Sequence, residues 1–201
     1  VSHALNCFVA ESFMDELADA AGKDPFEFRR TLLDRQPRFK RVLEQAAARA
    51  GWGKAPAGRH QGIALMEGYG TYLAQVAEVS VQQGTVRVHR VICVVDCGQM
   101  VNPAIVESQI ESGIIFGLTA ALWGEITLAG GKVRETNFDR YRLMRLNEAP
   151  AIEVELLASD ESPGGIGEPS TALVAPAVCN AIFAATGKRL RELPISKALK
   201  V

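Results

Sequence analysis

The chain has 201 residues, which is enough for one large domain or two small domains with a real core. Hydrophobic residues make up 48% and charged residues 22%, a globular balance that excludes a disordered chain. The 22 basic and 23 acidic residues leave a formal net charge of −1, so the composition predicts no nucleic-acid partner and no anionic-membrane partner.

Cysteine spacing argues against a metal site built by this chain alone. The four cysteines are Cys7, Cys93, Cys97 and Cys179, without a C-x-x-C pair, and the three histidines are scattered. We therefore expect buried free thiols and no protein ligand to a metal. The sequence begins without a Met, which indicates a piece of a longer chain. The lack of a signal peptide or membrane span in it then says little about the location of the parent protein.

The first fifty residues have the period of helices. Apolar residues recur at helical spacing until a glycine ends the pattern: Phe8, Phe13, Leu17, Ala20, then Gly22. Asp24 as N-cap and Pro25 at the first helical position predict a second helix, and a third is expected at about 38–50. The basic residues of 29–41 predict a solvated helix face. Residues 51–62 form a Gly/Pro/basic linker.

After the linker the period changes to that of strands. Residues 71–98 predict a β-hairpin with its turn near Gln83 and Gly84. The run from Val91 to Val95 is almost wholly apolar and predicts a central strand. Short strands are expected at 125–128 and 152–157, around the Gly130–Gly131 turn.

The strongest helix prediction covers residues 101–122, with Asn102 as N-cap and Pro103 at the first helical position. One stripe along it is apolar: Val106, Ile110, Ile114, Leu118 and Leu122. A second stripe has small residues headed by a glutamine: Gln109, Gly113, Gly117 and Ala121. Either another helix packs closely on this second stripe, or a bulky ligand lies against it and Gln109 hydrogen-bonds to the ligand.

A last helix is predicted from near Pro176 to a C-cap at Gly187. Helices followed by mixed strands and helices predict an α+β fold. Its parts are a helical segment, 1–51, and an α+β domain, 62–201, or one continuous domain over 1–201.

The segment from Pro163 to Ser170 places one carboxylate, Glu168, in a glycine-dense turn with apolar neighbours. Two interpretations are open. In a desolvated setting the pKa of Glu168 would rise, and the carboxylate would be a better base near neutrality. In an exposed turn the acid would simply point to water. Pro169 is expected to restrict Glu168 to extended conformations.

The glycines do not form a nucleotide-binding motif. After Gly165 and Gly167, Ser170 stands where the dinucleotide fingerprint has its third glycine. Gly187 and Lys188 lack both the upstream glycine and the following hydroxyl residue of a P-loop. A serine-hydrolase elbow is also absent from the sequence.

Four stretches remain, in a characteristic order: DCGQMVNP (96–103), QIESG (109–113), GIGEP (165–169) and APAVCNAIFAATGKR (175–189). This ordered set resembles the molybdenum-binding large subunit of molybdenum hydroxylases, the xanthine dehydrogenase and aldehyde oxidoreductase family. Its nearest likeness is to the C-terminal part of the large (β) subunits in the isoquinoline 1-oxidoreductase branch. The resemblance covers nearly the whole chain.

The resemblance implies roles for particular residues. The family's glutamate that acts as general base beside the metal falls on Glu168, and the glutamine that contacts the pterin falls on Gln109. Cofactor contacts are likewise implied for Gly113, Gly165 and Gly167, where the main chain can approach a large group.

The sequence departs from the family at Ser112, where a glycine is common. A serine there could crowd a close cofactor contact, although Gly113 keeps the nearer position.

The resemblance also implies cofactors and partners. These are a molybdopterin cofactor, in its cytosine dinucleotide form, that itself holds the molybdenum, and [2Fe-2S] clusters on a separate small subunit. The remainder of the large subunit would complete the site, so the isolated chain is expected to bind no molybdenum and to be inactive. The substrate would be an aldehyde or an N-heteroaromatic, and the location cytoplasmic or periplasmic.

Two other functions stay open at this point: a truncated, non-catalytic module of the same fold, and a small apolar-ligand binder that uses the Gln109 face.

Overall fold

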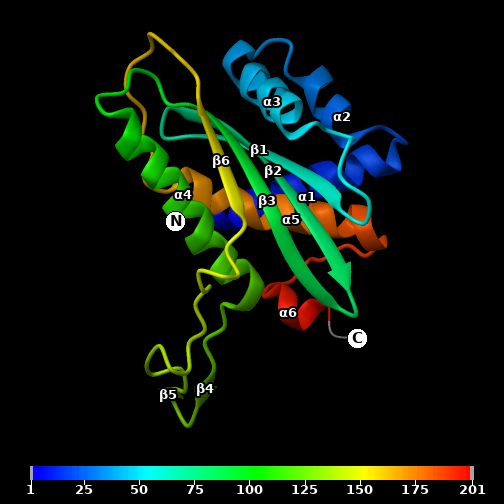
Figure 1. Ribbon diagram of the computed structural model, residues 1–201, viewed down its shortest axis with the longest axis vertical. Coiled ribbons are helices and arrows are strands. Elements are labelled where there is room, and N and C mark those ends of the chain that lie inside the picture. The colour runs from blue at the N-terminus through cyan, green and yellow to red at the C-terminus, as the bar shows by residue number, and fades with distance from the viewer. Residues whose placement is uncertain (1, 200–201) are drawn as a thin grey trace.

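The computed structural model describes residues 2–199 of the chain. A four-stranded sheet lies at the centre of the fold (Figure 1). The strands are β1 (His60–Gly68), β2 (Thr71–Gln82), β3 (Thr85–Asp96) and β6 (Ala151–Leu156), in the order β1-β2-β3-β6. Strands β1 to β3 form an antiparallel meander, and β6 adds to β3 in parallel. The fold is therefore α+β, as predicted.

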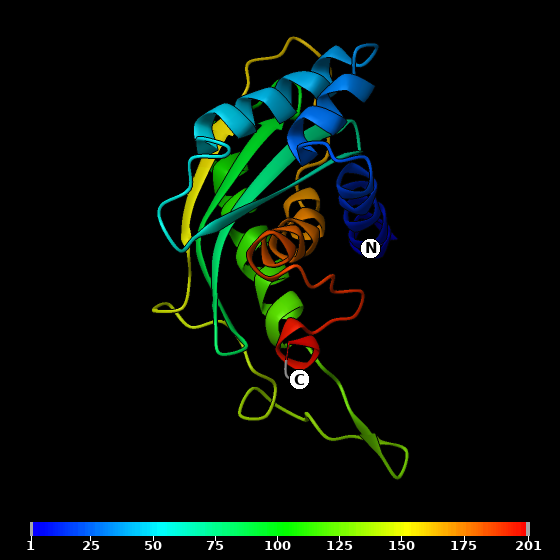
Figure 2. The same ribbon diagram turned by 90° about the vertical axis from the view of Figure 1, so that its right-hand side faces the viewer.

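Helices cover both faces of this sheet (Figure 2). On one face lies α3 (Pro37–Ala50), next to α2 (Pro25–Leu32). On the other face α5 (Pro169–Thr186) packs on β1 and β2, between α4 (Pro103–Trp123) and α1 (Ser2–Ala20). The helices of the 1–51 segment thus pack with the sheet-containing part and bury the side chains of α3 against it. A small hairpin, β4 (Leu128–Ala129) and β5 (Lys132–Val133), projects from the body, and α6 (Ile195–Ala198) follows α5.

The hairpin and the long helix agree with their sequence patterns. Gln83 and Gly84 form the turn between β2 and β3, both with positive φ, and β3 is an internal strand. Asn102 caps α4 through its side chain, and Pro103 is the first helical residue. The five apolar stripe residues of α4 are all buried. These two elements are therefore confirmed.

The start of α5 differs from the prediction. The helix begins at Pro169 and not near Pro176, which lies buried inside it. Proline at the first helical position costs nothing because its missing N–H would have no partner there. An internal proline lacks one intrahelical bond, and burial of nearly every side chain from Pro169 to Ile182 offsets that loss. The C-cap at Gly187 is confirmed, with φ of 70°.

Helix α1 buries a face that its apolar pattern does not indicate. Phe13 and Leu17 are 57% and 40% exposed, whereas Glu11 and Asp15 point inward with exposures of 8% and 3%. The charges are tolerated because Arg29 contacts both carboxylates, at 3.0 and 3.5 Å. The prediction of a solvated basic face over 29–41 is thus wrong for Arg29, which is 2% exposed.

Strand β1 was not predicted, because its first residues belong to the expected linker. Gly62 lets α5 lie directly on this strand: a Cβ there would stand 2.1 Å from the backbone nitrogen of Ala181. Two helices, α4 and α5, are long and apolar enough to cross a membrane. Half and two thirds of their apolar windows are nevertheless buried in this domain, as in core helices.

The four cysteines are free and buried, as expected. Burial raises the pKa of Cys93 and of Cys179 to about 12, so these thiols stay protonated at neutral pH.

Candidate functional site

Glu168 lies at the amino end of α5, in the N-cap position. Its side chain is exposed, so the described residues do not form the desolvated setting that would raise its pKa. Its φ and ψ of −116° and −25° are in the helical region, so the expected extended conformation is wrong. The local reason is that the Glu168 carbonyl already accepts a bond from the Thr171 amide, at 3.1 Å, which draws Glu168 into the first turn.

Three hydrogen bonds, two of them between backbone groups, fix the loop before Glu168 to the ends of three strands. The amide of Gly165 donates to the carbonyl of Tyr69 in the β1–β2 turn, at 2.8 Å. The amide of Gly164 donates to the carbonyl of Cys97, just after β3, also at 2.8 Å. In the opposite direction, the Thr71 hydroxyl donates to the carbonyl of Gly165 at 2.8 Å. The loop is therefore held by the sheet rather than by its own residues.

A buried glutamine holds the first turn of α5. Gln75, on β2, is fully buried, and its Nε2 donates to the Ser170 carbonyl at 2.8 Å. Within residues 2–199, Oε1 of Gln75 and Oγ of Ser170 are buried without a hydrogen-bond partner. A buried amide with one unmet acceptor is costly, and the bond that Gln75 does make fixes the position of the Ser170 carbonyl in the first turn of α5.

The small-residue stripe of α4 packs against α5. A Cβ on Gly113 would lie 2.0 Å from Oγ of Ser170, and a Cβ on Gly117 would lie 2.7 Å from the Thr171 carbonyl oxygen. Of the two interpretations of this stripe, close helix packing is confirmed for its glycines. Because α5 fills this space, the structure argues against an apolar-ligand site on the stripe.

Gln109 stands one turn before Gly113 on α4, and its side chain is exposed. Residues four apart lie on the same side of a helix. Gln109 is thus on the side of α4 that meets the first turn of α5, the turn that Glu168 begins. The structure brings Glu168, Gly113 and Gln109 to one end of the α4–α5 pair. The roles in cofactor binding stay predictions.

Two glycines of the loop have different surroundings. A Cβ on Gly165 would lie 2.9 Å from Cβ of Tyr69, so this glycine makes room for a side chain of the same domain. A Cβ on Gly167 would meet no atom within 4 Å. The main chain at Gly167 therefore presents an open surface next to the Glu168 carboxylate. Open backbone, an exposed amide at Gln109 and an exposed carboxylate together fit the edge of a large polar cofactor.

Sequence reasoning missed an ion pair below this loop. The carboxylate of Asp96, at the end of β3, accepts hydrogen bonds from Nε and Nη2 of Arg38 at 2.8 and 2.7 Å. The guanidinium holds the pKa of Asp96 below its ordinary value. Asp96 also accepts from the Gly98 amide, at 3.1 Å. The pair thus fixes the loop after β3, to which Gly164 is bonded. No local sequence signal joins residues 58 positions apart.

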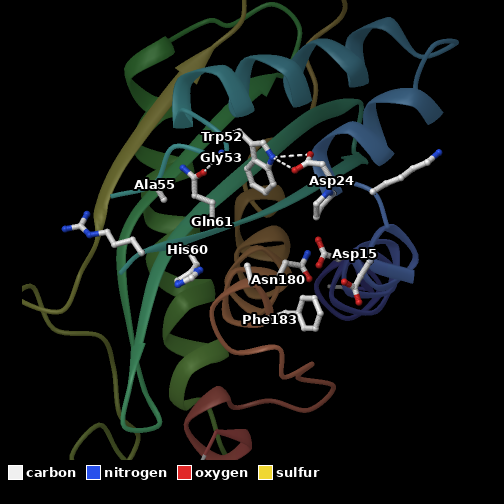
Figure 3. Close-up of a pocket in the computed structure, with 14 residues that line it drawn as sticks. Asp15, Asp24, Trp52, Gly53, Ala55, His60, Gln61, Asn180 and Phe183 are labelled. Atoms are coloured by element: carbon white, nitrogen blue, oxygen red, sulfur yellow. Dashed lines mark hydrogen bonds between the residues drawn. The ribbon is translucent and has the colours of Figure 1, made fainter. Parts of the chain in front are cut away.

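A separate cavity of about 440 Å³ lies between α1, α2, β1 and α5 (Figure 3). Asp15, Trp52, His60, Asn180 and Phe183 are among its lining residues. On its wall the Trp52 indole donates to both oxygens of Asp24, at 3.0 and 3.2 Å. Asn180 lies twelve positions after Glu168, which is about 18 Å along a helix. This cavity is therefore distinct from the candidate site.

Among residues 2–199, no three His, Cys, Asp or Glu side chains are grouped so that they could hold a metal ion.

Residues 9–150 match the molybdopterin cofactor-binding domain family, and the chain belongs to it. The chain is similar to the beta subunit of isoquinoline 1-oxidoreductase from Brevundimonas diminuta, with 35% identity over 96% of this chain and 25% of that protein. It is also similar to a subunit of the nicotinate dehydrogenase of Pseudomonas putida, with 36% identity over 98% of this chain and 18% of the other. The chain thus spans about a quarter or less of these relatives.

The fold is shared with a solved structure. The aldehyde oxidoreductase of Desulfovibrio gigas superposes with a TM-score of 0.72 over 99% of this chain and 41% of that one. Sequence identity there is 13%, so this likeness concerns the fold alone.

Proposed function

We propose that this chain is the cofactor-binding part of the large subunit of a molybdenum hydroxylase, and that Glu168 is its general base. The observation that carries the proposal is the position of Glu168. An exposed carboxylate begins α5 beside the open backbone of Gly167, on a loop held by three strand ends. Family membership supplies the cofactor that such an edge would face.

Each residue has a defined task in this proposal. Gln109 binds the pterin through its side-chain amide, and Gly167 approaches the cofactor through its main chain. The bound molybdenum cofactor supplies the two-electron oxidant for the substrate carbon. Glu168 accepts, at its carboxylate, the proton of the water-derived nucleophile, for which it must be ionised before the reaction. Gln75 and Gly113 keep α5, and with it Glu168, in a fixed position relative to α4.

The substrate and the partners follow from the same proposal. Two of the relatives are an isoquinoline oxidoreductase subunit and a nicotinate dehydrogenase subunit, which supports an N-heteroaromatic substrate, with an aldehyde as the alternative. The cofactor would be the cytosine dinucleotide form, and electrons would leave through a separate small [2Fe-2S] subunit. The remainder of the large subunit would complete the site, and the enzyme would act in the cytoplasm.

The test is Glu168→Gln in the full large subunit assembled with its small subunit. Gln keeps the shape of Glu but cannot accept the proton, so turnover per bound molybdenum should fall roughly 10²- to 10⁴-fold. Glu168→Asp, which withdraws the carboxylate by about an ångström, should cost about 10²-fold. Molybdenum content and melting temperature should stay at the wild-type values.

Glu192→Gln is the matched control, because Glu192 is exposed and lies beyond the other end of α5. This variant should keep full turnover. A Glu168→Gln enzyme within about threefold of wild type, at equal molybdenum content, would remove Glu168 from the chemistry and leave a non-catalytic module as the better account of the chain.

A further inference from the structure

Tyr69 occupies an unfavourable backbone conformation next to the candidate site. It is the first of the two residues that connect β1 to β2, with φ of 60°, and Gly70 follows with φ of 77°. Turns with two positive φ values favour Asn, Asp or Gly at the first position, because other side chains collide with the backbone. A bulky aromatic residue there persists only when its surroundings hold it.

Tyr69 contacts the Glu168 loop and α1. Its hydroxyl donates to Oε2 of Glu168 at 3.0 Å, and its carbonyl accepts the Gly165 amide at 2.8 Å. Its ring meets His3 edge-on, with ring centres 4.7 Å apart. The missing side chain of Gly165 lets the Tyr69 Cβ lie directly against the loop. Backbone and side chain of Tyr69 thus hold the same loop at two points.

We propose that Tyr69 is a positioning residue for Glu168, and that its hydroxyl holds the carboxylate in its ionised form and in one orientation. The inference rests on the proposed role of Glu168 as base. A donor on one carboxylate oxygen stabilises the charged form, which is the form that accepts a proton. The carboxylate in turn raises the pKa of the Tyr69 hydroxyl, so the phenol stays protonated and remains the donor.

The strained turn gives this contact its direction. Since φ of Tyr69 is fixed by the two-residue turn, its Cα–Cβ bond has a set direction, and the ring contact with His3 restricts the side chain further. The carbonyl of the same residue binds the loop that carries Glu168. The Glu168 carboxylate and the Tyr69 hydroxyl therefore keep a constant relative position, because Tyr69 holds both the hydroxyl and the loop that carries Glu168.

The test is Tyr69→Phe in the assembled enzyme, because Phe keeps the ring and removes only the donor. Loss of one hydrogen bond to a charged group should lower kcat about 10-fold, with KM within about twofold of wild type. Without the donor the pKa of Glu168 rises, so the acidic limb of the kcat/KM profile should move to higher pH. A purely structural loss would lower the rate equally at all pH values.

Controls assign these effects to the Tyr69–Glu168 pair. The N-terminal amine is the largest cause that lowers the pKa of Glu168, the Tyr69 hydroxyl follows, His3 also lowers it, and Cys7 acts on Tyr69. The variants His3→Gln and Cys7→Ala should leave the shift caused by Tyr69→Phe in place. Tyr72, on β2, packs its ring on Phe39. The variant Tyr72→Phe removes only the hydroxyl of this neighbouring tyrosine and should keep kcat within twofold of wild type. If Tyr69→Phe loses molybdenum, difluorotyrosine at position 69 replaces it as the test. This stronger donor should move the acidic limb to lower pH.

A double variant separates the two proposals. If Tyr69 acts through Glu168, adding Tyr69→Phe to Glu168→Gln should cost nothing further. A damaging Glu168→Gln together with a silent Tyr69→Phe would overturn the role of Tyr69 alone. A silent Glu168→Gln would overturn the proposed function itself. An increase in KM at constant kcat would make Tyr69 a substrate contact and would also refute the positioning role.

Discussion

Replacing Gly62 by alanine tests the close packing of α5 against β1. The added Cβ would stand 2.1 Å from the backbone nitrogen of Ala181 and 2.3 Å from the carbonyl oxygen of Ala177. Ordinary contact begins at 3.4 Å, so the strand and the helix must separate by about 3.4 − 2.1 = 1.3 Å. Both obstacles are backbone atoms, so no rotamer change can relieve them. A gap of 0.5–1 Å already forfeits a quarter to a half of a dispersion contact.

The expected cost follows from these distances. Overpacking costs typically 1–3 kcal/mol, and a backbone obstacle on a fully packed helix places Gly62→Ala at about 3 kcal/mol. The lower chain entropy of alanine returns roughly 0.5–1 kcal/mol, which leaves about 2 kcal/mol. Urea denaturation gives the free energy of unfolding. Gly130→Ala is the control: its φ is 57° and no atom lies near, so it loses about 1 kcal/mol or slightly more from backbone strain alone. A Gly62→Ala protein within 0.5 kcal/mol of wild type would refute the contact between β1 and α5.

Two further predictions concern buried charge. Arg29→Met leaves the Glu11 carboxylate buried without its partner, so the free energy of unfolding should fall by about 3–5 kcal/mol in a urea titration. The control is Arg35→Met, at an exposed position, which should change this free energy by less than about 0.5 kcal/mol. Because Arg38 depresses the pKa of Asp96, the pair stabilises the fold above the ordinary aspartate value of 3.8, and this contribution is lost as pH falls through the lower folded value. Arg38→Met should remove that part of the acid sensitivity, and identical stability-against-pH curves for the two proteins would contradict the ion pair.

The parts of the fold that could be predicted are those that local chemistry decides. Helix α4 has a capping asparagine, a proline at its first position and a continuous apolar stripe, and all three act within its own sequence. The β2–β3 hairpin has its turn residues and its strands in one stretch. In both elements the local preference and the tertiary packing agree.

The sequence-based predictions are wrong where a residue's burial depends on a partner that is distant in the sequence. Arg29 and Glu11 are buried because each neutralises the other across two helices, and neither sequence segment alone contains that information. For the candidate site, the ordered motifs led to Glu168, Gln109 and the loop glycines. Tyr69 and Gln75 could not be found, because their partners Glu168 and Ser170 lie 99 and 95 positions away.

The inverted face of α1 changes what a mutational scan of this helix should look like. Its outer row carries Leu5, Val9 and Phe13, with exposures of 74%, 67% and 57%. Its inner row carries the carboxylates of Glu11 and Asp15. Within this domain substitutions of these three apolar residues should therefore be tolerated, whereas substitutions of Glu11 or Asp15 should destabilise the fold. A hydropathy-based estimate of which residues matter would rank these five positions in reverse order.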